Sequence, residues 1–379
     1  MAVAGFATEQ GTERYVKRFA GQVAEGHFRR TPLGWLSSIG VGTYLGEPDP
    51  ATDRRYEQAI ARALGLGANV IDTAINYRFQ RSERAIAAVL GHLVAQGTLA
   101  RDELVVSTKG GFLTPDADDP RTPNQYFEEE YVRPGIITSP DDLVGGMHCM
   151  TPRYLENQLA RSLRNLDLET IDIYYLHNPE TQLPFLGRAA FHERLRAAFG
   201  ALEGFIAAGK LRVYGTATWN GYRQSPSSGE FLALAELVRL AEEVAGANHH
   251  FRVVQLPYNL AMPEARAHAN QPLDARPDGP PSGRRVSLLE AAQQLGIIVF
   301  ASASLLQGQV ASNLPQELSR VLDGLSTDAQ RAIQFVRSTP GITTALVGMS
   351  RLEHVEENLQ LAAKPPVPRE QFLQLFREE

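Results

Sequence analysis

Eight short runs of β-branched and aromatic residues, separated by segments with helical periodicity, constrain the fold of this chain more than any other feature. The runs are residues 38–44, 70–74, 104–109, 171–177, 213–218, 253–259, 297–304 and 342–349. Several of them, such as IDIYYLH at residues 171–177, are almost continuously apolar, which is typical of strands covered on both faces. The sequence therefore predicts a parallel sheet.

Helical periodicity recurs between these runs. The predicted helices are residues 53–64, 82–96, 152–166, 194–208, 230–245, 288–294 and 328–338. Parallel strands need a crossover of this kind, and eight such units close into a barrel whose chemistry lies at the carboxyl ends of the strands. We predict an α/β fold, a (β/α)₈ TIM barrel. An open doubly wound sheet is the main alternative, but no GxGxxG motif follows the first run.

Three segments depart from a minimal barrel, and we expect all of them to belong to one domain spanning residues 1–379. Residues 1–34 form an extension that we expect to supply a helix or a cap over the barrel floor. Residues 111–150 form a long insertion after the third strand, on the catalytic face, because their length exceeds an ordinary connection. Residues 263–285 are rich in Pro and Gly, which predicts irregular structure.

Charge and cysteine content exclude several classes of protein. The 37 basic and 43 acidic side chains give a formal charge of −6, so we expect no nucleic-acid partner. The sequence contains no apolar run of about eighteen residues, so we expect no membrane span, and we expect no signal peptide. Cys149 is the single cysteine, which favours a cytoplasmic location. His148 and Cys149 fall short of a tetrahedral ligand set, so we expect no metal.

Four acid–base side chains stand at the ends of three consecutive predicted strands. Asp72 and Tyr77 stand in IDTAINY at the end of the second strand, Lys109 ends VVSTK in the third, and His177 ends IDIYYLH in the fourth. Neighbouring strand ends of a barrel converge on one mouth, so these side chains are expected in one pocket. Each taken alone has a structural explanation, such as a turn cap or a buried histidine, but together they match the needs of one reaction.

Our hypothesis for that reaction is the reduction of a carbonyl group. The carbonyl oxygen gains negative charge as hydride arrives, so a proton donor is required, and Tyr77 is our candidate. A free phenol has a pKa of about 10, and the Lys109 ammonium is expected to ease release of its proton. Asp72 would pair with the buried ammonium, and His177 would orient the carbonyl.

Several motifs occur in a fixed order over residues 33–362. They are ANVIDTAINY with SERAIAAVL, VVSTKGG, LARSLRNLDLETIDIYYLHNPE, LEGFIAAGKLRVYGTATW, VVQLPYN and LVGMSRLEHVEENL. Through these motifs the chain resembles the aldo-keto reductases. The resemblance implies that Asp72, Tyr77, Lys109 and His177 form a catalytic tetrad. It also implies that NAD(P)H binds extended across the barrel mouth without a Rossmann domain.

The same resemblance implies a set of cofactor contacts. Gln255 matches the side chain that binds the nicotinamide carboxamide, although it could instead only join neighbouring strand ends. Glu357 and Asn358 match the adenine contacts, while Ser350 and Arg351 are candidates for holding a 2′-phosphate. The alternative is an ordinary solvated helix. On these residues we expect NADP(H) as the preferred cofactor, with NAD(H) as the second choice.

The chain departs from the family pattern around the expected nicotinamide site. Ala217 stands where a Ser hydroxyl is usual, Thr218 where Asn is common, and Ser302 where an aromatic ring normally stacks. We still expect Thr218 and Ser302 to contact the cofactor. Trp219 is expected to line the substrate pocket. Tyr126 and Tyr131 of the long insertion are also placed there, with packing of the insertion against the barrel as the alternative.

The resulting hypothesis is an NAD(P)H-dependent oxidoreductase that interconverts a carbonyl, in an aldehyde, ketone or sugar, with an alcohol. Its expected partner is that small molecule, and the sequence leaves the oligomeric state open. Two alternatives keep the same fold. One is a nucleotide-binding regulatory subunit with little turnover, and the other is an epimerase or lyase that recycles its cofactor on a sugar-like substrate.

Overall fold

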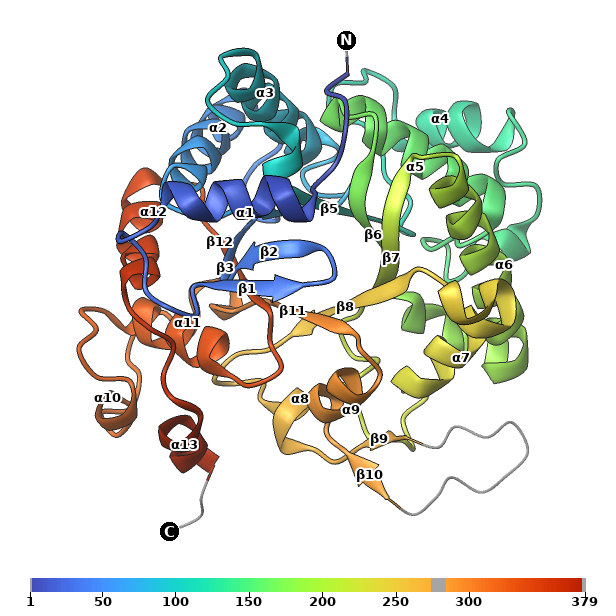
Figure 1. The fold of residues 1–379 in the computed structure, drawn as a ribbon. Helices are drawn as coiled ribbons and strands as arrows, with labels where there is room; N and C mark the ends of the chain where they lie inside the picture. The colour runs from blue at the N-terminus through green and yellow to red at the C-terminus, as the bar shows by residue number, and fades with distance from the viewer. Residues whose placement is uncertain (1, 274–283, 377–379) are drawn as a thin grey trace.

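The computed structural model describes residues 2–273 and 284–376, and a closed barrel of eight parallel strands lies at its centre (Figure 1). The strand order around the barrel is β11-β12-β3-β4-β5-β6-β7-β8, so neighbours in the sequence are neighbours in space. All eight predicted strands are present, and the TIM barrel prediction is confirmed. The strands are β3 (Ile39–Gly42), β4 (Val70–Asp72), β5 (Val105–Gly110), β6 (Ile171–His177), β7 (Leu211–Ala217), β8 (Phe251–Pro257), β11 (Ile298–Ser302) and β12 (Thr344–Gly348).

A helix follows each barrel strand and covers its outer side. These helices are α2 (Pro50–Leu64), α3 (Arg81–Ala95), α5 (Pro152–Leu166), α6 (Leu183–Ala207), α7 (Leu234–Ala245), α9 (Leu288–Gln294), α11 (Asp328–Ser338) and α12 (Leu352–Leu359). The span of α6 begins eleven residues before the predicted start, because it joins two helices at Gly187, whose φ of 71° and ψ of 163° are not helical, and the predicted helix lies in the second of them. Helix α2 begins at Pro50, where the Asp49 side chain accepts a hydrogen bond from Thr52 N–H at 2.7 Å.

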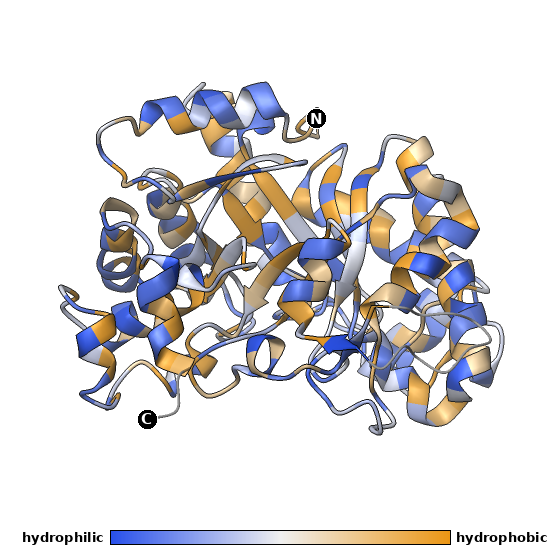
Figure 2. Ribbon diagram, turned by 60° about the horizontal axis from the view of Figure 1, so that its bottom comes forward, coloured by the Kyte–Doolittle hydropathy of each residue, from blue (hydrophilic) through white to orange (hydrophobic). Residues whose placement is uncertain are grey.

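Alternation along each strand divides the apolar residues into two layers. In β6, Ile173 and Tyr175 point into the barrel, while Tyr174 and Leu176 pack against the surrounding helices. The strands are accordingly mostly apolar in Figure 2, while the surrounding helices carry polar stripes. Because side chains alternate along a strand, the sequence determines which residues face the barrel interior. The same alternation determines which side chain faces inward at the end of each strand, at the mouth of the barrel.

The floor of the barrel is closed by the N-terminal extension. Helix α1 (Glu9–Arg18) lies beside an antiparallel hairpin of β1 (Phe28–Thr31) and β2 (Gly34–Ser37), which crosses the barrel opening in Figure 1. Leu33 and Leu36 from this hairpin join the inner layer. The expected helix and cap are therefore both present. The hairpin itself was not predicted, because the charged residues Arg29 and Arg30 mask its alternation.

The insertion after β5 carries α4 (Pro123–Phe127), a π-helical turn (Glu128–Val132) and a 3₁₀ turn (Pro140–Asp142). Residues 274–283, within the stretch predicted to be irregular, lie outside the described residues. That prediction is wrong at the ends of the stretch, which form α8 (Glu264–Ala267), β9 (Gln271–Pro272) and β10 (Arg285–Val286). The remaining helices are α10 (Leu318–Val321) and α13 (Arg369–Phe372). Within residues 2–273 and 284–376, no helix has the length and apolar character needed to cross a membrane.

Candidate active site

A cavity of about 830 Å³ opens at the carboxyl ends of the barrel strands. Its walls include the last inward-facing residues of several strands, among them Asp72 of β4, His177 of β6 and Gln255 of β8. The strand register sets Asp72 beside Ser107 and His177 beside Ala217. Side chains that are distant in the sequence therefore meet at one mouth, as the strand ends predicted.

Asp72 and Lys109 form a buried ion pair below this cavity. Lys109 Nζ donates to Asp72 Oδ2 at 2.6 Å and to the Thr73 carbonyl at 2.7 Å, and the Lys109 side chain is 1% exposed. Burial lowers the pKa of Lys109, but the Asp72 carboxylate and Tyr77 outweigh it, so the net pKa is raised. Lys109 therefore carries its charge at neutral pH.

Tyr77 lies above the ammonium, whose Nζ is 4.8 Å from the centre of the phenol ring. Burial raises the pKa of Tyr77, while the nearby Lys109 opposes this shift without cancelling it. The phenol therefore keeps its proton at neutral pH and can donate it.

The turn after Tyr77 is unusual, because the next three residues, Arg78, Phe79 and Gln80, have positive φ angles of 51°, 51° and 76°. Buried Arg78 holds this turn through an ion pair with Asp53 on α2.

His177 faces the same cavity and is uncharged. Burial is the largest cause that holds its pKa well below the usual range, and Lys109 adds to the effect. The ring lies edge-on to Tyr77, with 5.9 Å between ring centres. The residue's backbone is tied to the insertion, because His148 Nε2 lies 2.7 Å from the His177 carbonyl oxygen and Gln182 Nε2 lies 2.9 Å from His148 Nδ1. His177 is therefore suited to act as a neutral hydrogen-bond donor.

Burial of His148 predicts a loss of stability in acid. Its pKa is lowered to about 4, mainly by burial, whereas an unfolded histidine titrates near 6.5. Between these two pH values the unfolded chain binds a proton that the folded chain does not, so the free energy of unfolding decreases as the pH is lowered. We expect the stability advantage of the wild type over a His148→Gln variant to shrink by about 2 kcal/mol from pH 7.5 to pH 5. Urea unfolding at both pH values measures it, and a constant difference would contradict it.

Most of the residues expected to bind cofactor do line the cavity. These are Thr218, Gln255, Ser302, Ser350, Glu357 and Asn358. Thr218 Oγ1 and Asn358 Oδ1 are buried and have no hydrogen-bond partner among the described residues. Both residues line the cavity, so a molecule bound there can supply the missing partners. Polar groups at both ends of an elongated dinucleotide would satisfy them, so the residues present fit this cofactor.

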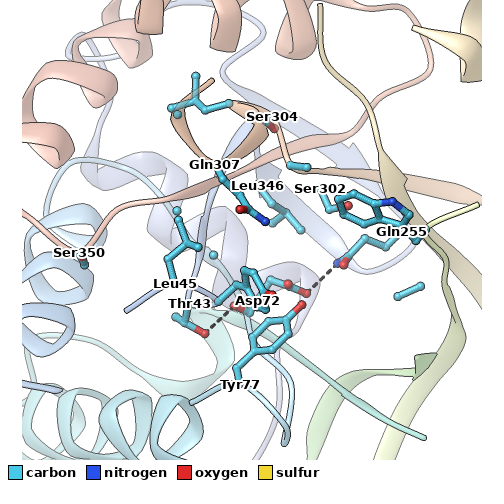
Figure 3. Close-up of a pocket in the computed structure, with 18 of the residues that line it drawn as sticks. Thr43, Leu45, Asp72, Tyr77, Gln255, Ser302, Ser304, Gln307, Leu346 and Ser350 are labelled. Carbon is cyan, nitrogen blue, oxygen red and sulfur yellow. Dashed lines mark hydrogen bonds between the residues drawn. The ribbon is translucent and has the colours of Figure 1, made fainter. Parts of the chain in front are cut away.

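Gln255 has an additional role within the protein. Its Nε2 donates to Asp72 Oδ1 at 2.8 Å, the same oxygen that accepts from Ser107 Oγ at 2.7 Å. Figure 3 shows this bond on the side of the cavity toward which the Tyr77 hydroxyl points. The structure therefore shows the second possibility raised from the sequence, because the amide nitrogen joins neighbouring strand ends, while contact of Gln255 with nicotinamide stays a prediction.

The structure corrects three of the expected site residues. Arg351 is exposed at the N-cap of α12, where it lies 3.5 Å from Glu353, and it does not line the cavity. Tyr126 and Tyr131 do not line it either. They are 4% and 1% exposed and pack in a separate apolar cluster that joins the insertion to α5. Trp219 does line the cavity and is 42% exposed.

Some residues of the site were missed from the sequence. Ser107 binds Asp72, and alternation could have found it, because Ser107 and Lys109 are two apart in β5 and share the inner face. Phe112 lies edge-on to His177, with 5.1 Å between ring centres, and lines the cavity. His354 lines the far end of the cavity beside Ser350. Phe112 lies outside the strands, so no periodicity points to it, whereas His354 is three and four residues before Glu357 and Asn358 in α12, so helical spacing could have found it.

Comparison with known proteins agrees with this architecture. Residues 38–227, half of the chain, match the aldo/keto reductase family. A D-threo-aldose 1-dehydrogenase from Pseudomonas sp. is 32% identical over 40% of this chain and 40% of that enzyme. A putative voltage-gated potassium channel subunit beta of Schizosaccharomyces pombe is 22% identical over 86% and 84% of the two chains.

Solved structures share the fold over nearly the whole chain. An aldo/keto reductase from Klebsiella pneumoniae, in complex with NADP and acetate, superposes with a TM-score of 0.58 at 21% identity. The superposition covers 93% of this chain and 94% of that one. The barrel, the strand-end residues and the sequence match lead to the same assignment. This chain belongs to the aldo/keto reductase family.

Proposed function

We propose that this protein is an NADP(H)-dependent oxidoreductase that interconverts the carbonyl of an aldehyde, ketone or sugar with an alcohol. The observation that carries the proposal is that Asp72, Tyr77 and His177 line one cavity, with Lys109 paired to Asp72 directly below it and close to Tyr77. A proton donor, a buried cation beside it, a counter-charge and a neutral hydrogen-bond donor are the groups that carbonyl reduction requires.

The proton chemistry follows from the environment of each group. Tyr77 donates its phenolic proton to the carbonyl oxygen as negative charge develops there, and Lys109 stabilises the phenolate that remains. Asp72 holds the ammonium in place through the 2.6 Å ion pair. His177 donates a hydrogen bond that orients the carbonyl, and it remains uncharged because burial lowers its pKa. In the oxidation direction the same step runs in reverse, and the Tyr77 phenolate, stabilised by Lys109, accepts the alcohol proton.

NADP(H), when bound, supplies or accepts the hydride. Thr218 and Gln255 would hold its nicotinamide end, while Ser350, Glu357 and Asn358 would hold its adenosine end. Because Ser350 lines the cavity and Arg351 does not, the preference for a 2′-phosphate rests on Ser350 and not on a guanidinium. We keep NADP(H) ahead of NAD(H).

A cytoplasmic location remains part of the proposal and is supported by the single buried Cys149.

Two measurements test this function. Nicotinamide fluorescence on addition of protein reports NADPH binding, and a panel of aldehydes, ketones and aldoses reports turnover. We expect saturable binding and consumption of NADPH matched one-to-one by alcohol product. Absence of binding at millimolar NADPH would refute the proposal. Product formation without net consumption of NADPH would instead favour the cofactor-recycling epimerase or lyase.

A regulatory role is the second candidate. The putative potassium channel subunit of Schizosaccharomyces pombe aligns with most of this chain, and Ala217 and Ser302 stand where the family pattern has a hydroxyl and an aromatic ring. A regulatory subunit would bind nucleotide without appreciable turnover and would form a stable complex with a partner protein. Turnover of the isolated chain on the carbonyl panel separates the two functions.

Ser302 gives a direct test of the nicotinamide site. The residue ends β11 on the inner face and lines the cavity. An aromatic ring there could stack on nicotinamide, which contributes about 0.5–1.5 kcal/mol. We expect Ser302→Tyr to lower the NADPH Kd about two- to tenfold. Ser302→Leu adds bulk without a ring and is the matched control, so equal effects of the two variants would argue against stacking.

A further inference from the structure

Glu180 is a buried carboxylate three residues beyond His177. It lies in the 3₁₀ turn Pro179–Gln182, after Asn178 in a left-handed conformation (φ 49°), and its exposure is 1%. Burial raises the pKa of this carboxyl to about 7, and bonds from backbone N–H groups oppose that rise. A carboxylate in such a place is unfavourable unless it is well hydrogen-bonded, so its partners indicate what it is there to hold.

Those partners are three consecutive backbone N–H groups beyond the end of β7. Glu180 Oε1 accepts from the N–H groups of Trp219, Asn220 and Gly221 at 2.7, 3.0 and 3.2 Å. The chain leaves the barrel here, so these donors have lost the strand ladder that would otherwise pair them. One side-chain oxygen replaces that ladder and ties the end of β7 to the end of β6.

Trp219 is held from the other side as well. Its carbonyl accepts from Arg223 Nε at 2.9 Å, and Arg223 in turn pairs with Glu264 of α8 at 2.9 Å. Both backbone groups of Trp219 are therefore bonded by side chains, its N–H by Glu180 and its carbonyl by Arg223. The indole itself is 42% exposed and lines the cavity, so the contacts that fix its position act on its backbone.

We propose that Glu180 is a positioning residue for substrate binding, because its carboxylate fixes the backbone from Trp219 to Gly221 and thereby sets the indole as a wall of the cavity. This inference rests on the proposed reductase function for the identity of the ligand that meets the wall. It predicts that loss of Glu180 weakens binding of the carbonyl substrate more than it slows the chemical step.

The test uses Trp219 as its own reporter. The chain has two tryptophans, so a Trp35→Phe background leaves Trp219 alone. In this background we expect Glu180→Ala to raise KM for the carbonyl substrate about tenfold or more while kcat changes less than about threefold, since small misplacements weaken productive binding. We also expect acrylamide quenching of Trp219 emission to rise at least about twofold, because the indole is no longer fixed.

Two further variants keep the test decisive. Glu180→Gln keeps an acceptor oxygen but loses the charge, and we expect values between wild type and Glu180→Ala. If Glu180→Ala does not fold, the KM and the acrylamide quenching of Glu180→Gln test the proposal instead. Glu230→Gln is the matched control, because Glu230 bonds the Asn220 side chain in the same loop at 2.8 Å and no Trp219 group.

Unchanged KM and quenching in both Glu180 variants would overturn the proposal, and so would equal effects from Glu230→Gln. Lower thermal stability without these changes would assign Glu180 a purely structural role and would also overturn it. The quenching readout needs no turnover. A chain without reductase activity would therefore refute the proposed function, while Trp219 quenching would still report on Glu180.

Discussion

Replacing Tyr77 by Phe is expected to lower kcat for carbonyl reduction by about 10²–10⁴-fold, the usual contribution of a positioned general acid. The phenol is the protonated group beside the buried ammonium, and its ring also packs edge-on against His177. Phe keeps the ring and removes only the proton donor. Affinity for NADPH should therefore change less than about threefold, as measured by fluorescence titration.

Tyr126→Phe is the matched control for this variant. It removes a hydroxyl that bonds Gln80 and Arg161, in the insertion cluster outside the cavity. We expect its kcat to stay within about threefold of wild type even if some stability is lost. A Tyr77→Phe enzyme that keeps more than about one tenth of the wild-type kcat would assign the proton transfer to another group.

Replacing Lys109 by Met is expected to damage both stability and activity. The substitution leaves the Asp72 carboxylate buried with Ser107 and Gln255 as donors but without its cation. Breaking a buried pair from one side typically lowers the free energy of unfolding by about 3–5 kcal/mol. The phenolate at Tyr77 also loses its stabilising charge, so kcat should fall together with kcat/KM. Urea unfolding and steady-state kinetics measure the two effects separately.

A double variant separates the two roles of Lys109. Asp72→Asn combined with Lys109→Met removes both charges, and we expect it to recover most of the lost stability because no unpaired charge remains buried. Activity should stay low, since the cation beside Tyr77 is still absent. If the double variant instead shows the sum of the two single losses, the ion pair contributes little coupling and this account of Lys109 is wrong.

The barrel and the tetrad were predictable because both depend on local patterns. Almost continuous apolar runs mark strands that are covered on both faces, and alternation within them fixes which side chains face the mouth. Lys109 is two residues beyond Ser107, and His177 is two beyond Tyr175, so both fall on the inner face. Their meeting with Asp72 follows from strand order alone, without knowledge of any loop.

The residues that escaped prediction lie in loops or depend on contacts between distant segments. Tyr126 and Tyr131 were placed in the substrate pocket because the insertion follows a catalytic strand. The insertion packs instead against α3 and α5, where Arg84 pairs with Asp116 and Arg161 with Glu130. Arg351 was expected to hold a 2′-phosphate, but it is exposed at the N-cap of α12, 3.5 Å from Glu353, and does not line the cavity. Neither outcome has a periodic signal in the sequence.

The left-handed turn after Tyr77 limits how far this site can be transplanted. Three consecutive non-glycine residues adopt positive φ angles, which are unfavourable for L-amino acids. The ion pair between Arg78 and Asp53 of α2 stabilises this turn. Transferring only the sequence IDTAINY to another barrel would therefore not reproduce the orientation of the Tyr77 phenol, because Asp53 would be missing. The smallest portable unit of this active site therefore includes the first helix of the barrel.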